Sequence, residues 1–116
     1  RSRLAVLTNK PLAATLTILD AFGLASFFSG GVIGGDGPLA RKPDPAGLTH
    51  LIAAASTSPG ETLLVGDSIV DWRTAMAGGT HCCLAGYGFG FEGFSRGHLT
   101  PDVLIIDRPL GLLDLL

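Results

Sequence analysis

The chain has 116 residues, of which 47% are hydrophobic and 16% charged, a composition that suits one folded domain and excludes intrinsic disorder. The formal net charge is −2 and the basic residues are scattered, so no clustered basic face indicates a nucleic-acid partner. The sequence shows neither an apolar run of the roughly 18 residues that cross a membrane nor a charged-then-apolar leader, so we expect a cytoplasmic protein without membrane contact.

The first third of the chain predicts a strand, a helix and a second strand. Leu4–Thr8 is a short apolar run of the kind that is buried on both faces of a sheet. Asn9 can cap a helix that has Pro11 in its first turn. The buried stripe of this helix is expected to hold Leu12, Leu16, Leu19 and Phe22. Val32–Ile33, between two glycine pairs, predicts the next strand.

The middle of the chain repeats this alternation. A polar loop covers residues 36–45, and Asp44 near its end can cap the next helix. That helix is expected to bury Leu48, Leu51, Ile52 and Ala55. Thr62–Val65 predicts a strand, and Ser68–Ala77 a helix that ends at Gly78–Gly79.

The last third adds two strands and completes the predicted fold. His81–Ala85 and Val103–Ile106 read as strands, and Leu110–Leu116 as a short terminal helix. Cys82 and Cys83 are adjacent, so they are expected to be reduced thiols rather than a disulfide. Strands that alternate with helices predict an α/β fold over residues 1–116, a Rossmann-like parallel sheet with helices on both faces.

Two further features have ordinary interpretations. The aromatic side chains of Phe22 and Trp72 are expected in or near the core. The glycine-rich segment Gly86–Gly97 predicts an irregular loop, which could edge a site or simply pack on the surface.

Polar residues follow three of the predicted strands, where ligands bind in open α/β sheets. Thr8 and Asn9 follow the first strand, Lys42 lies in the loop after the second, and Asp67 ends the third. Asp71 stands one helical turn further on. Folding could therefore gather these five residues into one site.

Each residue also has a structural explanation that needs no function. Thr is common at strand ends, and Asn9 can be a helix cap. Lys42 can be a solvated charge in a polar loop. Ser68 and Asp71 match a capping box, which explains that carboxylate without a ligand.

Together, however, the segments resemble three motifs of the haloacid-dehalogenase-like superfamily, in the family's order. Leu7–Lys10 resembles the second motif, a hydrophobic strand that ends in Thr or Ser. Arg41–Pro45 resembles the Lys-Pro-x-Pro third motif, and Leu64–Asp71 the fourth motif, Gly-Asp-Ser-x-x-Asp. The resemblance covers roughly Leu4 to Leu113, and the residues of its motifs are most similar to those of the phosphoglycolate phosphatase branch.

The resemblance implies a role for each of the five residues. The Thr8 hydroxyl and the Asn9 backbone N–H would donate to phosphate oxygens, and Lys42 would pair with the phosphate and the nucleophile. Asp67 would bind Mg²⁺, whose preferred ligands are oxygens. Asp71 would be a further ligand or a partner that holds Lys42 or a metal-bound water. The implied reaction is hydrolysis of a small phosphate monoester, 2-phosphoglycolate as the best guess, through an aspartyl-phosphate.

One motif of the family is missing from these residues. The family's first motif, Asp-x-Asp, supplies the nucleophile and the general acid/base, and no Asp-x-Asp occurs in this sequence. We expect that the first strand and the cap domain lie upstream of Arg1, so that the chain is the C-terminal part of a catalytic core. The isolated chain is therefore expected to be inactive.

The missing strand also predicts unpaired sheet edges. In the family it lies between the strands Leu4–Thr8 and Thr62–Val65, and open apolar edges favour self-association or strand exchange. Other functions remain open: a phosphosugar mutase or a metal-independent dehalogenase of the same superfamily, or a non-catalytic α/β binding module. The paired acids Asp67 and Asp71 disfavour the dehalogenase because they suit a cation.

Overall fold

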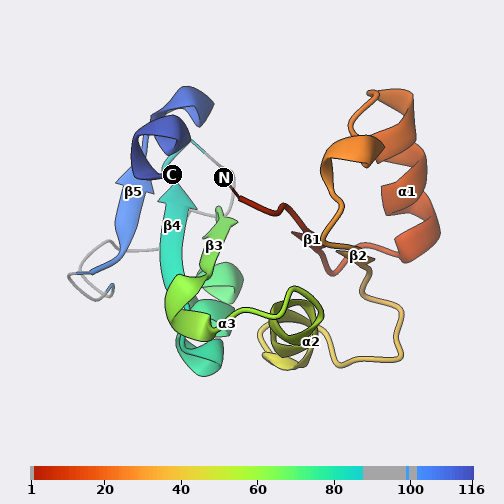
Figure 1. Cartoon of the computed structure of the whole chain (residues 1–116), viewed down its shortest axis with the longest axis horizontal. Coiled ribbons are helices and arrows are strands. Elements are labelled where there is room, and N and C mark those ends of the chain that lie inside the picture. The colour runs from red at the N-terminus through yellow and green to blue at the C-terminus, as the bar shows by residue number, and fades with distance from the viewer. Residues whose placement is uncertain (1, 88–98, 100–101) are drawn as a thin grey trace.

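The computed structural model describes residues 2–87, 99 and 102–116, and most of the predicted loop Gly86–Gly97 lies outside them. Its described strands form two parallel sheets (Figure 1). Strand β1 (Val6–Leu7) pairs with β2 (Val32–Ile33), with Val6 opposite Val32. The parallel α/β architecture confirms the prediction from the sequence.

The second sheet has three strands in the order β3-β4-β5. Its members are β3 (Leu63–Gly66), β4 (His81–Ala85) and β5 (Leu104–Ile106), all parallel. No strand pairing joins β1 to β3 among the described residues. Both strands therefore keep one unpaired edge, as expected if a strand of the family fold is absent between them.

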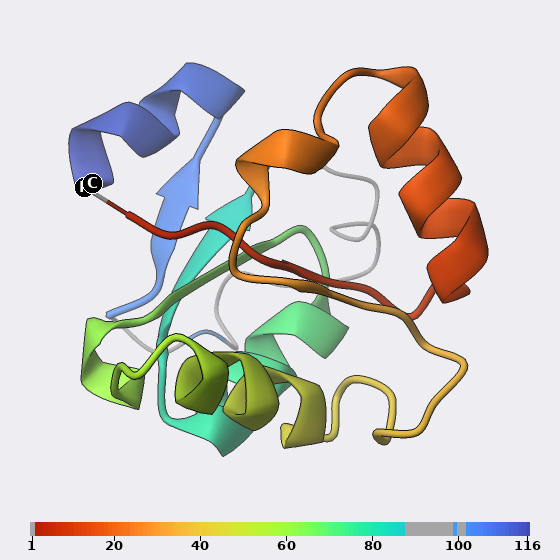
Figure 2. The ribbon, with the colours of Figure 1, turned by 45° about the vertical axis from the view of Figure 1, so that its right-hand side comes forward.

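Three α-helices cover the strands. Helix α1 (Leu12–Ala21) lies on one side of the strands, and α2 (Ala46–Ala54) and α3 (Ile69–Gly78) lie on the other (Figure 2). Short 3-10 helices are η1 (Ala25–Phe27), η2 (Pro59–Glu61) and η5 (Pro109–Leu115). The last one stands where the sequence predicted a terminal helix. None of the described helices has the length and apolarity needed to span a membrane.

Helix α3 begins and ends almost as its sequence predicts. Ser68 is its N-cap, and the reciprocal bonds of a capping box with Asp71 are both present. The helix ends at Gly78 and is capped by Gly79, whose φ of 73° is left-handed and therefore suits glycine. These short-range signals fix the segment that carries the two acidic residues of the site.

Helix α1 differs from its prediction at its first turn and in its buried stripe. Asn9 does not cap it; Pro11 holds the cap position, and Asp36 Oδ1 accepts the Leu12 backbone N–H at 3.0 Å. The predicted buried stripe is also wrong at two positions, because the Leu16 side chain is 45% exposed and that of Phe22 is 74% exposed. Thr15 and Leu19 are the buried residues. The helix packs mainly against β2 and η1, so only a narrow face is covered.

The hydrophobic core lies between α3 and the three-stranded sheet. Its fully buried members are Ala75, Cys82 and Leu84. Trp72 packs against them, which confirms its predicted place near the core. Cys82 and Cys83 are free, buried thiols, as expected, and burial raises the pKa of Cys82 to about 12.

Candidate active site

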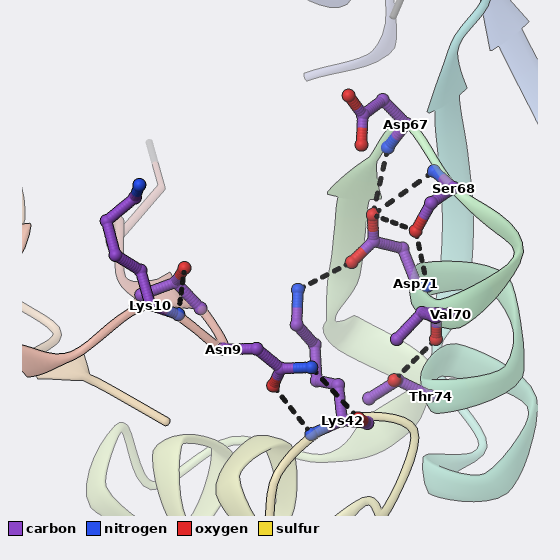
Figure 3. Close-up of polar contacts among 9 residues, drawn as sticks. Asn9, Lys10, Lys42, Asp67, Ser68, Val70, Asp71 and Thr74 are labelled. Carbon is purple, nitrogen blue, oxygen red and sulfur yellow. Dashed lines mark hydrogen bonds and ion pairs between the residues drawn. The ribbon is translucent and has the colours of Figure 1, made fainter. Parts of the chain in front are cut away.

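The loops after β1 and β2 and the segment after β3 meet at one rim of the molecule (Figure 3). The Lys42 ammonium lies 2.6 Å from Asp71 Oδ1 in an ion pair whose two side chains are both largely buried. The Asn9 side chain contacts the backbone of Lys42 through two hydrogen bonds. Asn9, Lys42 and Asp71 are thus linked to one another, although they come from distant parts of the chain.

Asp71 is the most connected group of the site. Its Oδ1 accepts from Lys42, and its Oδ2 accepts from the Asp67 N–H at 2.9 Å and from the Ser68 N–H and hydroxyl at 3.3 and 3.2 Å. Burial alone would raise the pKa of Asp71, but the Lys42 ammonium and these hydrogen bonds outweigh it, so that the pKa lies below its ordinary value of 3.8. The carboxylate is therefore ionised at neutral pH.

Gly66 explains why this carboxylate can lie against the end of β3. A Cβ atom at Gly66 would overlap with the Asp71 carboxylate, and the bonds from Asp67 and Ser68 depend on that close approach. The glycine of the Gly-Asp-Ser sequence is thus required because a side chain would not fit there, and not because of its backbone conformation. It lets the backbone after β3 wrap around the carboxylate of the next helix.

Asp67 contacts Asp71 through its backbone. Its N–H donates to Asp71 Oδ2, whereas Figure 3 draws no interaction from its carboxylate to the other labelled residues. Among the residues that the structure describes, none donates a hydrogen bond to the half-buried Asp67 carboxylate. An acceptor group without donors at such a position is suited to a cation.

The donor set fits a magnesium ion in part. No group of three or more His, Cys, Asp or Glu side chains that could hold a metal occurs within the described part of the chain. Mg²⁺ is usually bound through one or two carboxylates, with waters and substrate phosphate as its remaining ligands. Asp67 can supply one such ligand, while both oxygens of Asp71 already accept hydrogen bonds.

Thr8 is less closely connected than predicted. Its hydroxyl accepts the Lys10 backbone N–H at 3.1 Å. Within the described part of the chain it makes no hydrogen bond to Lys42, Asp67 or Asp71. Thr8 is half-buried and stands next to Asn9, so it borders the group of linked residues without joining it.

The side chain of Asn9 is the feature that the sequence did not reveal. Its residue type suggested a helix cap, and the resemblance suggested a backbone donor. Its amide instead bridges to Lys42, which is 33 positions away. The only available signal was that an amide can donate and accept at once.

Comparison with known proteins identifies the family. A family model described as haloacid dehalogenase-like hydrolase matches residues 1–79, a segment that contains all five site residues. The chain belongs to this family. This confirms the resemblance seen in the three motifs.

Related sequences and structures agree with this assignment. The chain is 39% identical over 103 residues to a phosphoglycolate phosphatase of Nitrosospira multiformis, covering 89% of this chain and 44% of that protein. It is 45% identical over 87 residues to a phosphoglycolate phosphatase of Cereibacter sphaeroides, covering 75% and 38%. The chain thus spans less than half the length of either relative.

Two crystal structures share the fold over almost the whole chain. A predicted phosphoglycolate phosphatase from Haemophilus somnus 129pt superposes with a TM-score of 0.82 at 30% identity, covering 97% of this chain and 49% of that chain. A haloacid-dehalogenase-superfamily hydrolase from Geobacter sulfurreducens gives a TM-score of 0.80 at 28% identity, covering 100% and 53%. The Rossmann-like fold of this hydrolase family is therefore established for the described strands and helices.

Proposed function

We propose that residues 1–116 form the C-terminal part of the catalytic core of a magnesium-dependent phosphatase of the haloacid dehalogenase-like family. The Lys42–Asp71 ion pair is the observation that carries this proposal, together with the Asp67 carboxylate beside it, which accepts no hydrogen bond from the described residues. The names of the relatives favour 2-phosphoglycolate as the substrate. The free thiols Cys82 and Cys83 fit a reducing cytoplasm as its location.

The side chains of the chain suit phosphoryl transfer, which is mostly positioning and charge neutralisation. Lys42 would bind a phosphate oxygen and the attacking carboxylate, while the Thr8 hydroxyl and the Asn9 N–H would donate to other oxygens. Asp67 would hold Mg²⁺, which neutralises phosphate charge when bound. Asp71 would hold Lys42 and the backbone of Asp67 in place, because its oxygens are occupied by those groups.

The nucleophile is proposed to lie outside these 116 residues. The unpaired edges of β1 and β3 face the gap between the two sheets (Figure 1), and Val65 of β3 is 44% exposed. We infer that a strand ending in Asp-x-Asp pairs with both edges and brings its carboxylates to the rim near Lys42. Without that strand the edges are free for self-association or strand exchange.

A chimera tests this function. The chain would replace the matching segment of the Nitrosospira multiformis phosphoglycolate phosphatase, which supplies the remaining residues. We expect Mg²⁺-dependent release of phosphate from 2-phosphoglycolate, and a loss of about 100-fold or more in kcat on Lys42→Ala because a charged contact to the transferred group is removed. In Asp67→Asn, phosphate release should require a higher concentration of Mg²⁺.

The matched control is Thr17→Ala in the same chimera, since Thr17 is exposed on α1 and its hydroxyl donates to the Ala13 carbonyl of the same helix. The isolated chain should release no phosphate. A folded chimera whose activity is absent, or is unchanged by Lys42→Ala, would refute the proposed role of this site. Robust turnover by the isolated chain would refute the external nucleophile.

A further inference from the structure

The side chain of Asn9 joins two loops that lie far apart in the sequence. Its Nδ2 donates to the backbone carbonyl of Lys42 at 3.0 Å, and its Oδ1 accepts the backbone N–H of Lys42 at 2.9 Å. The donor and the acceptor of the Asn9 amide therefore both bind the backbone of Lys42, as a neighbouring strand would. Figure 3 shows this bridge on the opposite end of Lys42 from its ammonium group.

Other contacts fasten the same two loops together. The Gly35 N–H donates to the Lys10 carbonyl at 2.8 Å, and Asp36 accepts the Leu12 N–H. A Cβ atom at Gly35 would overlap with the Asn9 backbone, so the two segments are in close contact. The loop after β1 and the start of the loop after β2 are thus one connected unit, and Asn9 extends it to Lys42.

Lys42 is consequently held at both ends. Its ammonium pairs with Asp71, and its backbone is bound by Asn9. A lysine side chain has a flexible four-carbon stem, so the position of its charge depends on where its backbone is fixed. The loop that carries Lys42, residues 34–45, is rich in Pro and Gly and forms neither helix nor strand, so regular backbone hydrogen bonds do not fix its backbone.

We propose that Asn9 is a positioning residue, whose side-chain amide sets the place from which Lys42 reaches the phosphate and Asp71. The effect of Asn9 on phosphate binding rests on the proposed function, whereas the hydrogen bonds from Asn9 to Lys42 do not. This positioning role differs from the expected role of Asn9, in which only the backbone N–H takes part. A purely structural Asn9 would stabilise the fold without governing how Lys42 binds an anion.

Hydrogen exchange of the full 116-residue chain, followed by NMR, tests the bridge directly. In the unmutated chain, the Lys42 backbone N–H and the Asn9 side-chain amide protons should exchange more slowly than in an unfolded chain. In Asn9→Ala, the Lys42 N–H should exchange at least about tenfold faster because its acceptor is gone. The control Thr17→Ala removes a hydrogen bond on α1 and should leave Lys42 unchanged.

Binding of inorganic phosphate with Mg²⁺, followed by calorimetry, tests the consequence. Asn9→Ala should lower phosphate affinity about as much as Lys42→Met does, roughly tenfold or more for a lost charged contact, whereas Thr17→Ala should not. If the unmutated chain binds no phosphate, the proposed function fails, while the exchange measurement still decides the bridge. The positioning role is overturned if the Lys42 backbone N–H exchanges at the same rate in the unmutated chain and in Asn9→Ala. If Asn9→Ala does not fold, the role is overturned by a Lys42 N–H in the unmutated chain that exchanges as fast as in an unfolded chain.

Discussion

The two halves of the molecule differ in how they are packed. Among the described residues from 2 to 45, which form β1, α1 and β2, Leu19 is the one buried hydrophobic residue. The half formed by α3, β3, β4 and β5 holds the core cluster, in which Leu84 is fully buried. The first half is therefore a thin layer, and the second is a packed unit.

The candidate site lies across both halves. Asn9 and Lys42 belong to the thin half, whereas Asp67 and Asp71 belong to the packed half, and the ion pair joins them. Helix α2 also connects the halves, because it lies against β1 at one point and against α3 at another. The packed half therefore supplies most of the stability, while the proposed chemistry requires the thin half to stay in contact with it.

The largest expected effect comes from the core of the packed half. Leu84→Ala should lower the free energy of unfolding by about 2–5 kcal/mol, because it removes buried methyl groups and leaves a cavity. Leu16→Ala is the matched change in the thin half, and it should alter the free energy by no more than about 0.5 kcal/mol. Urea denaturation of both variants measures the difference, and similar costs at the two positions would contradict the comparison.

A smaller effect is expected at the ion pair between the halves. Lys42→Met keeps most of the apolar stem but leaves Asp71 without its cation, which should cost roughly 1–3 kcal/mol at pH 7 because a buried charge loses a partner. Lys10→Met is the control, since Lys10 is an exposed lysine on the same rim. Urea denaturation of the two variants and the unmutated chain measures both costs.

The pH dependence of that cost identifies Asp71 as the partner. Because the pKa of Asp71 is lowered in the folded state, its contribution to stability is present above the ordinary value of 3.8 and is lost as the pH falls through the lowered value. The difference between the unmutated chain and Lys42→Met should thus be full at pH 7 and shrink on acidification below about pH 4. A difference that stays constant to low pH would mean that the pair is not what joins the halves.

The sequence predicts best where its signals are short-range. Ser68 and Asp71 are three residues apart, so their capping box could be read directly and its geometry is present. The strand limits of β4 were predicted to the residue, because its buried part, Cys82–Ala85, is an uninterrupted apolar run. The bond from Asn9 to Lys42 could not be predicted, since any backbone group could have been its partner.

The thin half is also where helical periodicity misled the prediction. A repeat of apolar residues shows which face of a helix is apolar but not how much of that face another element covers. The strands below α1 are only two residues long, so little surface is available to bury its stripe. The same limit explains why β1 is shorter than the predicted run Leu4–Thr8: β2, its one partner among the described strands, is flanked by glycines.

The smallest expected effect is at Phe22, and it tests whether the thin half is as exposed as it looks. The Phe22 side chain is 74% exposed, so Phe22→Ser should change the free energy of unfolding by less than about 0.5 kcal/mol. Urea denaturation at low and high protein concentration measures this change. A cost of several kcal/mol that appears only at high concentration would mean that α1 is covered by another copy of the chain, since association stabilises the folded state by mass action. The thin half would then be one side of an interface, and its exposed leucines would belong to a shared core.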